Sequence, residues 1–440
     1  MKQTFLIDDK TLKDTKIKSI NERSVFDYFN KTYTEGGQER LLELFNSPTK
    51  DPKEIIARQN SFKRYTNLLE LEFPFDKTII KDIHKFLVTP RSHTKSVFDS
   101  LNFFRINTPE YFYTKRTVLE VFQVLLSLKH ILGIIIKWDS GTEIMENYEK
   151  TQKCIDRFGE LQKSTLSEKL FISFTNIDSF ETEIRENLRD DLLSLILMIY
   201  DIDAGLAVIK SKNILKLEFA KITTKAESNT IEAMGLFNIF HKKPVRNNVK
   251  ITSNKRIWFL TGPNMAGKSS LIKSISIAVY LAHIGFPVPA LSFTANALDG
   301  LFTSINLEDD SELGHSYFYA EIFRLKEIVE KLDKNSNALI ILDELFKGTN
   351  EEDASDAIVQ IVKNFNLLTA PVVLITSHNT NVYDKLSQYS IVDYFKMDIA
   401  RDLSGFPVFT YKLVPGIAKD KLGMYLLEKS GLIKTFEKKY

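Results

Sequence analysis

The chain has 440 residues, a formal net charge of +2 at pH 7, and 43% hydrophobic and 26% charged residues. This length exceeds one compact core and predicts roughly two to three domains of a soluble globular protein. The nearly balanced charge excludes the strongly basic arm that signals nucleic-acid binding, and the single cysteine, Cys154, excludes an intramolecular disulfide and a cysteine-based zinc site.

The first half of the chain is predicted to be helical. Its start, Met-Lys-Gln-Thr-Phe, has no apolar signal core, so we expect a cytoplasmic protein. No proline occurs between Pro109 and Pro244, which is typical of long helices because proline breaks a helix interior. The most apolar stretch, residues 118–138, is interrupted by Glu120 and Lys129 and therefore predicts a packed helix and no contact with a membrane.

The second half has the pattern of an α/β domain. Short β-rich runs occupy residues 257–260, 339–342 and 372–375, and each is followed by a glycine-containing turn or a helical pattern. This alternation predicts a sheet covered by helices. We expect the boundary between the two halves near residues 225–245.

A phosphate-binding loop follows the first of these runs. Residues 262–269 read Gly-Pro-Asn-Met-Ala-Gly-Lys-Ser and lie between a predicted strand and a predicted helix over 269–283. The glycines let backbone N–H groups turn toward phosphate oxygens at the N-terminus of the helix. We expect Lys268 to bridge the β- and γ-phosphates of ATP and the Ser269 hydroxyl to bind Mg²⁺.

Polar residues follow the β-rich runs at 339–342 and 372–375, and we predict that they take part in ATP hydrolysis. Asp343 is expected to bind the Mg²⁺ ion, Glu344 to polarise the attacking water, and His378 to contact that water or the γ-phosphate. Acids after a strand are often merely exposed and a lone histidine is often structural, but the preceding phosphate loop favours the functional interpretation. Ser316 opens a further predicted helix, where it is either a plain helix cap or part of a second subunit's nucleotide site.

These elements, in this order, resemble those of the MutS family of DNA mismatch-repair ATPases, within the ABC class. Residues 261–270 are similar to that family's phosphate loop, differing chiefly by Ala266 in place of glycine and Ser270 in place of threonine. The resemblance assigns Tyr411 to an adenine-stacking position. It implies a nucleotide-binding set of Gly262, Pro263, Asn264, Met265, Ala266, Gly267, Lys268, Ser269, Ser270, Ser316 and Tyr411.

Further segments carry the same resemblance. Residues 309–321 look like the family's signature-helix motif, 343–349 like its Asp-Glu-x-x-x-Gly-Thr, and 411–416 with Gly423 like its closing segment. The signature positions are Asp309, Asp310, Gly314, Ser316 and Glu321, and Ser377-His378 takes the place of the family's Thr-His. Upstream, residues 36–59 and 200–208 resemble the two ends of the family's helical core, or lever, domain.

The resemblance implies three parts, and the chain departs from the family in two places. The parts are an N-terminal extension over 1–25, an all-helical core (lever) domain over 26–235, and an ABC-type P-loop α/β ATPase domain over 236–440. Full-length mismatch sensors carry two further domains before the core, with a Phe-x-Glu wedge, so we expect a short form without the mismatch-recognition and connector domains. Residues 350–353 also replace a more serine-rich loop.

We therefore expect an Mg²⁺-dependent ATPase that works as a homodimer and couples ATP binding to a grip on DNA. Its place is in DNA mismatch repair or another step of repair or recombination, with weak or no preference for a mismatch. The alternative is a nucleotide-dependent switch that acts on a protein partner without binding DNA.

Overall fold

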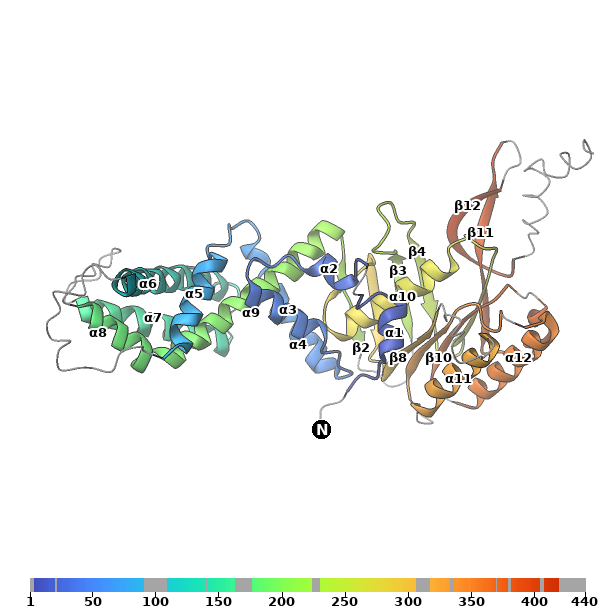
Figure 1. Cartoon of the computed structure of the whole chain (residues 1–440). Helices are drawn as coiled ribbons and strands as arrows, with labels where there is room; N and C mark the ends of the chain where they lie inside the picture. The colour runs from blue at the N-terminus through green and yellow to red at the C-terminus, as the bar shows by residue number, and fades with distance from the viewer. Residues whose placement is uncertain are drawn as a thin grey trace, which may run out of the picture. The chain divides into compact units, whose positions relative to one another are not determined.

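The computed structural model describes residues 4–19, 22–90, 109–139, 141–162, 176–223, 230–305, 317–332, 336–347, 349–368, 370–378, 381–403 and 407–418. The chain is mixed helical and α/β, as predicted, and it forms two compact units (Figure 1). The sheet unit comprises Met1–Tyr28, Ser47–Gln59 and Lys212–Tyr440, and the helical unit comprises Phe29–Asn46 and Asn60–Ser211.

The helical unit is built from long helices without internal proline. Its elements are α3 (Glu35–Phe45), η1 (Thr66–Leu68), α5 (Lys77–Val88), α6 (Pro109–Ile136), α7 (Thr142–Gln162), α8 (Ile177–Thr182), the π-helix η4 (Glu183–Asn187) and most of α9 (Arg189–Leu215). The chain passes between the units four times: within α2 (Val25–Phe29), after Asn46, within α4 (Pro52–Lys63) and near the end of α9.

The core of the helical unit explains its apolar helices. Rings of Phe122, Phe158 and Phe180 lie in succession with centroids 5.6 Å apart. Helices α6 and α9 are long and apolar enough to cross a membrane by length and composition alone, but both contribute buried side chains to this core. Within α9, the buried Asp203 accepts hydrogen bonds from the Thr34 N–H and hydroxyl, and so fixes the N-cap of α3.

The sheet unit contains one large sheet and two smaller ones. The six-stranded sheet has the order β12 (Pro407–Pro415), β11 (Val392–Arg401), β5 (Ile257–Thr261), β10 (Val372–Thr376), β9 (Ala338–Leu342), β8 (Gly300–Ser304). All its neighbours are parallel except β11 and β12. The four-stranded sheet has the order β2 (Lys221–Thr223), β7 (Ser292–Asn296), β3 (Ile231–Leu236), β4 (Asn247–Ile251), and β1 (Glu218–Phe219) pairs with β6 (Pro287–Val288).

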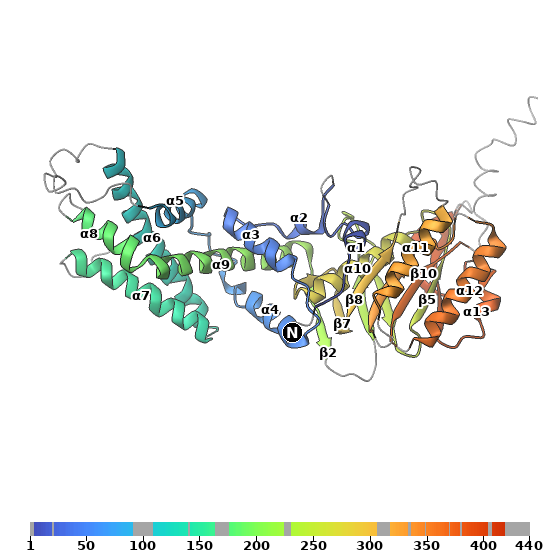
Figure 2. The same cartoon turned by 60° about the horizontal axis from the view of Figure 1, so that its bottom comes forward.

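Helices cover the large sheet. Helices α11 (Tyr317–Glu330), α12 (Glu351–Leu367) and α13 (Val382–Leu386) share one apolar cluster with β5, β8, β9 and β10 (Figure 2). Helix α10 (Lys268–His283) follows β5 directly. The strands at 257–260, 339–342 and 372–375 and the helix at 269–283 are thus confirmed. Strands β5, β9 and β10 are buried along their whole length, because a parallel sheet is covered on both faces.

The units differ from the predicted domain limits at both ends of the helical region. The first strand already begins at Glu218, and the first 28 residues belong to the sheet unit, where α1 (Asp9–Asp14) lies beside β8. Short strands with lysine and threonine, such as β2, carry little apolar periodicity. The pattern that identifies buried strands therefore does not reveal them.

Candidate nucleotide-binding site

The loop between β5 and α10 carries the residues that are predicted to bind phosphate. Gly267 caps α10 with φ 101°, in the left-handed region that favours glycine. A Cβ at this position would lie 3.2 Å from the Tyr411 ring, so the missing side chain also allows that ring to approach. The buried Lys268 ammonium donates to the carbonyls of Gly262 at 2.8 Å and Pro263 at 3.2 Å. Met265 has φ 67° and is 84% exposed at the tip of the loop.

The ends of β9 and β10 bring the predicted catalytic residues together. The Thr376 hydroxyl donates to Asp343 Oδ1 at 2.6 Å and accepts from the Glu344 N–H at 2.8 Å. His378 Nε2 lies 2.8 Å from Glu344 Oε1 and 3.4 Å from Lys268 Nζ. Adjacent parallel strands end at one edge of the sheet, which is why residues distant in sequence meet here.

Charges around Glu344 keep its carboxyl ionised. Partial burial would raise the pKa of Glu344, but hydrogen bonds from Lys347 and His378 outweigh that effect and hold the pKa below its usual value. The Lys347 ammonium lies 2.7 Å from the carboxylate. Burial lowers the pKa of Lys268, and the carboxylates of Glu344 and Asp343 oppose that shift. The cluster therefore holds opposite charges close together in a partly buried position.

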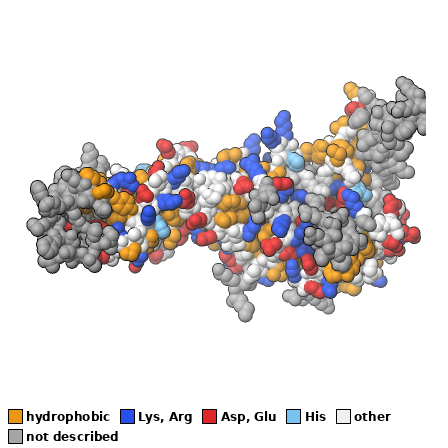
Figure 3. All heavy atoms as spheres, in the orientation of Figure 1, with side chains coloured by type: hydrophobic (Ala, Val, Ile, Leu, Met, Phe, Trp, Pro, Cys, Tyr) orange, Lys and Arg blue, Asp and Glu red, His pale blue; other side chains and the backbone are white. Residues whose placement is uncertain are grey.

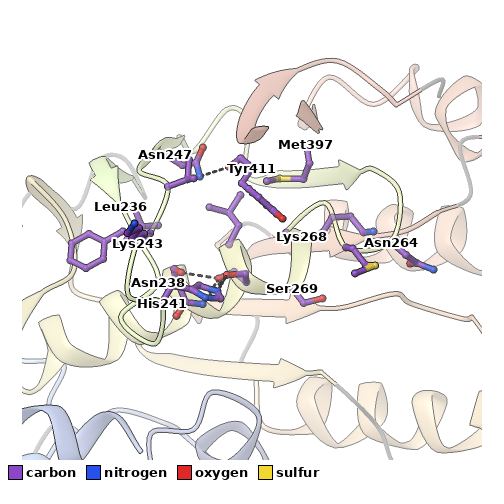
Figure 4. A pocket seen from close by; sticks show the side chains of 18 of the residues that line it. Leu236, Asn238, His241, Lys243, Asn247, Asn264, Lys268, Ser269, Met397 and Tyr411 are labelled. Atoms are coloured by element: carbon purple, nitrogen blue, oxygen red, sulfur yellow. Dashed lines mark hydrogen bonds between the residues drawn. The ribbon is translucent and has the colours of Figure 1, made fainter. Parts of the chain in front are cut away.

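A cavity of about 480 Å³ adjoins the loop (Figure 4). Figure 4 shows Asn264 and Lys268 at one end and Leu236 and Lys243 at the other, with Tyr411 between them. The lining from the predicted set consists of Pro263, Asn264, Met265, Gly267, Lys268, Ser269, Ser270, Glu344 and Tyr411. The other predicted residues, Gly262, Ala266, Asp343 and His378, lie beside the cavity rather than in its wall.

The opposite wall comes from a segment that the sequence interpretation missed. Asn238 donates to the Ser270 hydroxyl at 2.8 Å, and His241 Nε2 lies 3.2 Å from the same oxygen. Asn247 donates to the Tyr411 carbonyl at 3.0 Å, which holds β12 beside this wall. Residues 236–247 have no motif that marks them, and only their contacts with α10 and β12 reveal a role.

A buried carboxyl supports the loop that carries Glu344. On α11, Glu321 is 2% exposed and its Oε1 accepts from the Phe346 N–H at 3.1 Å. Glu344 and Phe346 both have positive φ, at 50° and 62°, so this loop needs tertiary support. Burial raises the pKa of Glu321 to about 7. Its Oε2 has no hydrogen-bond partner among the residues that the structure describes.

Several predicted positions lie outside the described residues. These are Asp309, Asp310, Gly314, Ser316, Gly348 and Gly423. The interpretation of Ser316 as a cap or as a residue of a partner's site therefore stays a prediction.

Comparison with known proteins supports the resemblance. A family model described as MutS domain V matches residues 258–437. The DNA mismatch repair protein MutS of Aquifex pyrophilus is 26% identical over 94% of this chain and 53% of that protein. MutS of Finegoldia magna is 25% identical over 91% of this chain and 48% of that protein. DNA mismatch repair protein MSH3 of Yarrowia lipolytica is 33% identical over 39% of this chain and 17% of that protein.

The MutS proteins of Aquifex pyrophilus and Finegoldia magna match most of this chain, and the chain spans about half of their length. Their similarity extends over both the helical unit and the sheet unit, and the family model covers the phosphate loop and the strands that end in Asp343 and His378. On this evidence, the chain belongs to the MutS family.

Proposed function

We propose that this chain binds ATP in the cavity beside α10 and hydrolyses it with Mg²⁺. One observation carries the proposal: His378 lies within hydrogen-bonding reach of both Lys268 and Glu344, and these two residues line a cavity of about 480 Å³. This volume is in the ordinary range for a small-molecule site, roughly 300–1,000 Å³. The phosphates of ATP would contact the loop and the helix N-terminus, and the base would lie toward Tyr411.

The residues present suit Mg²⁺. Asp343 and the Ser269 hydroxyl offer oxygen ligands near the phosphate loop, and among the described residues no cluster of three or more His, Cys, Asp or Glu forms a metal site of its own. Mg²⁺ commonly takes one or two protein ligands together with nucleotide phosphates. When bound, the ion would neutralise charge that develops on the phosphates.

The chain's own residues would supply the remaining chemistry. Glu344 is ionised at neutral pH and would accept a hydrogen bond from the attacking water, which orients and polarises it. His378 lies against the same carboxylate and would contact the water or the γ-phosphate. Lys268 would stabilise negative charge as the bond to the leaving phosphate breaks.

DNA is the proposed partner, and a homodimer the proposed working form. In this proposal, the helical unit acts as a lever domain, the sheet unit as the ATPase domain, and Ser316 completes the site of the second subunit. Figure 3 shows Lys and Arg side chains interspersed with Asp and Glu on the face in view. A grip on DNA would therefore rest on scattered phosphate contacts, which position a duplex without identifying its bases.

Two measurements test the proposal. Phosphate release from ATP with Mg²⁺ should depend on Lys268, and binding to duplex and branched DNA should weaken steeply as salt is raised, because phosphate contacts release counterions. DNA is titrated with and without ATP. If the protein hydrolyses ATP but binds no DNA at low salt in either condition, the alternative of a nucleotide-dependent switch on a protein partner replaces the DNA proposal.

A further inference from the structure

The N-terminal residues 5–14, here called the N-terminal clasp, complete the free edge of the large sheet. Strand β8 is an edge strand whose outward N–H groups belong to Leu301, Thr303 and, just beyond it, Ile305. All three are satisfied by the clasp: they donate to the Leu6 carbonyl at 2.9 Å, the Thr11 hydroxyl at 3.0 Å and Asp14 Oδ2 at 2.9 Å. An open edge would otherwise expose unpaired backbone groups.

The clasp also holds α11 through a buried ion pair. The Arg324 guanidinium is 5% exposed and makes two bonds to the Asp8 carboxylate, at 2.8 and 3.0 Å. It donates in addition to the Thr303 carbonyl at the end of β8. Lys331 lies 3.0 Å from the same carboxylate. A two-pronged arginine–carboxylate pair fixes geometry as well as charge, so α11 is tied to both the clasp and the sheet edge.

A second contact joins α11 to the loop at residues 343–347, here called the catalytic loop. One helical turn before Arg324, Glu321 accepts from the Phe346 N–H, within the loop that carries Glu344. Glu344 and Phe346 both have positive φ, so this loop depends on its neighbours for its shape. On α10, burial and the charge of Lys16 lower the pKa of Lys273, and the carboxylates of Asp14 and Asp343 counter that shift.

We propose that the N-terminal clasp is a positioning element for ATP hydrolysis, in which Asp8 holds α11 so that Glu321 can hold the catalytic loop. The inference rests on the proposed ATPase function and names a part of the chain on which the rate of that function depends. The cavity wall is made by other segments, at 236–247, 263–270 and around Tyr411. The clasp therefore sets the rate of hydrolysis and leaves nucleotide affinity unchanged.

The test is Asp8→Asn in the full chain. Asparagine keeps the N-cap of α1, where the Asp8 carboxylate accepts from the Thr11 N–H, but it removes the charge opposite Arg324. We expect kcat to fall roughly two- to thirtyfold, the range found for side chains that couple two sites, with the Kd of a fluorescent ATP analogue unchanged. Amide exchange in residues 343–347 should become faster.

Two controls make the same kind of change beside the clasp pair. Asp9→Asn alters an exposed neighbour in α1, and Glu327→Gln removes the exposed carboxylate 3.2 Å from Arg324, so both should retain the native kcat and exchange rates. Thermal unfolding establishes that each variant is folded at the assay temperature. If Asp8→Asn does not fold, Lys331→Met replaces it under the same criteria, because it removes one of the two cations that pair with Asp8.

Three outcomes would overturn the inference: a native kcat in the folded variant, an equal loss in a control, or a loss of nucleotide affinity that matches the loss of rate. If the native chain hydrolyses no ATP, the proposed function fails instead. Amide exchange then still tests the clasp, because unchanged exchange in residues 343–347 of Asp8→Asn would contradict its positioning role.

Discussion

Replacing Glu344 by glutamine separates catalysis from binding and folding. Glutamine keeps an oxygen for His378, whose Nε2 lies 2.8 Å away, but loses the charge opposite Lys347. That ion pair is partly exposed, with 59% and 22% side-chain exposure, and such pairs stabilise a fold by only about 0.2–1 kcal/mol. Loss of a group that activates water typically slows a reaction roughly 10²–10⁴-fold, or about 2.7–5.5 kcal/mol in the barrier. We therefore expect kcat to fall at least about a hundredfold while the fold remains intact.

ATP should still bind to the Glu344→Gln protein. The substitution removes a negative charge near Lys268 and the proposed γ-phosphate position, so the Kd for ATP should stay the same or decrease. Steady-state phosphate release, fluorescent-nucleotide titration and thermal unfolding measure the three quantities. Glu352→Gln, at an exposed position in the first turn of α12, is the matched control. A native kcat, or a loss of affinity as large as the loss of rate, would refute the role assigned to Glu344.

Four further outcomes are expected. In a titration, Lys268→Ala should weaken ATP binding itself. Mixing Lys268→Ala with Ser316→Ala protein should restore part of the hydrolysis in mixed dimers. No recovery despite proven subunit exchange would argue against a shared site. Mismatched and matched duplexes should bind within a few-fold of each other in a filter or anisotropy assay, and a hundredfold preference, worth about 2.7 kcal/mol, would contradict this. Burial lowers the pKa of His283 to about 4, so unfolding takes up a proton below the ordinary pKa of 6.5. Stability measured in urea should therefore fall as the pH is lowered from about 6.5 to 4, by up to about 3 kcal/mol, and His283→Gln should lack that part of the slope.

The strand–loop–helix arrangement around the predicted phosphate loop was readable from the sequence because it is local. The motif lies within a dozen residues: a buried strand, two glycines five residues apart, and Lys268 at the start of a helix. Strand β5 and helix α10 occur where this motif predicts them. The acids after β9 and the histidine after β10 were assigned to one catalytic site, and they meet because parallel strands end at a common edge of the sheet.

The remaining parts of the site depend on contacts between distant segments. Thr376 bridges Asp343 and Glu344 from another strand, and residues 236–247 reach α10 and β12 through amide hydrogen bonds that no spacing in the sequence announces. The first residues looked like an extension, but they pair with a strand that begins at Gly300. The sequence by itself determined which residues are candidates to bind phosphate and to polarise water, since those roles require particular residue types in short motifs. Only the tertiary structure decided what surrounds and supports them, because hydrogen bonds between segments about three hundred residues apart leave no periodicity in either one.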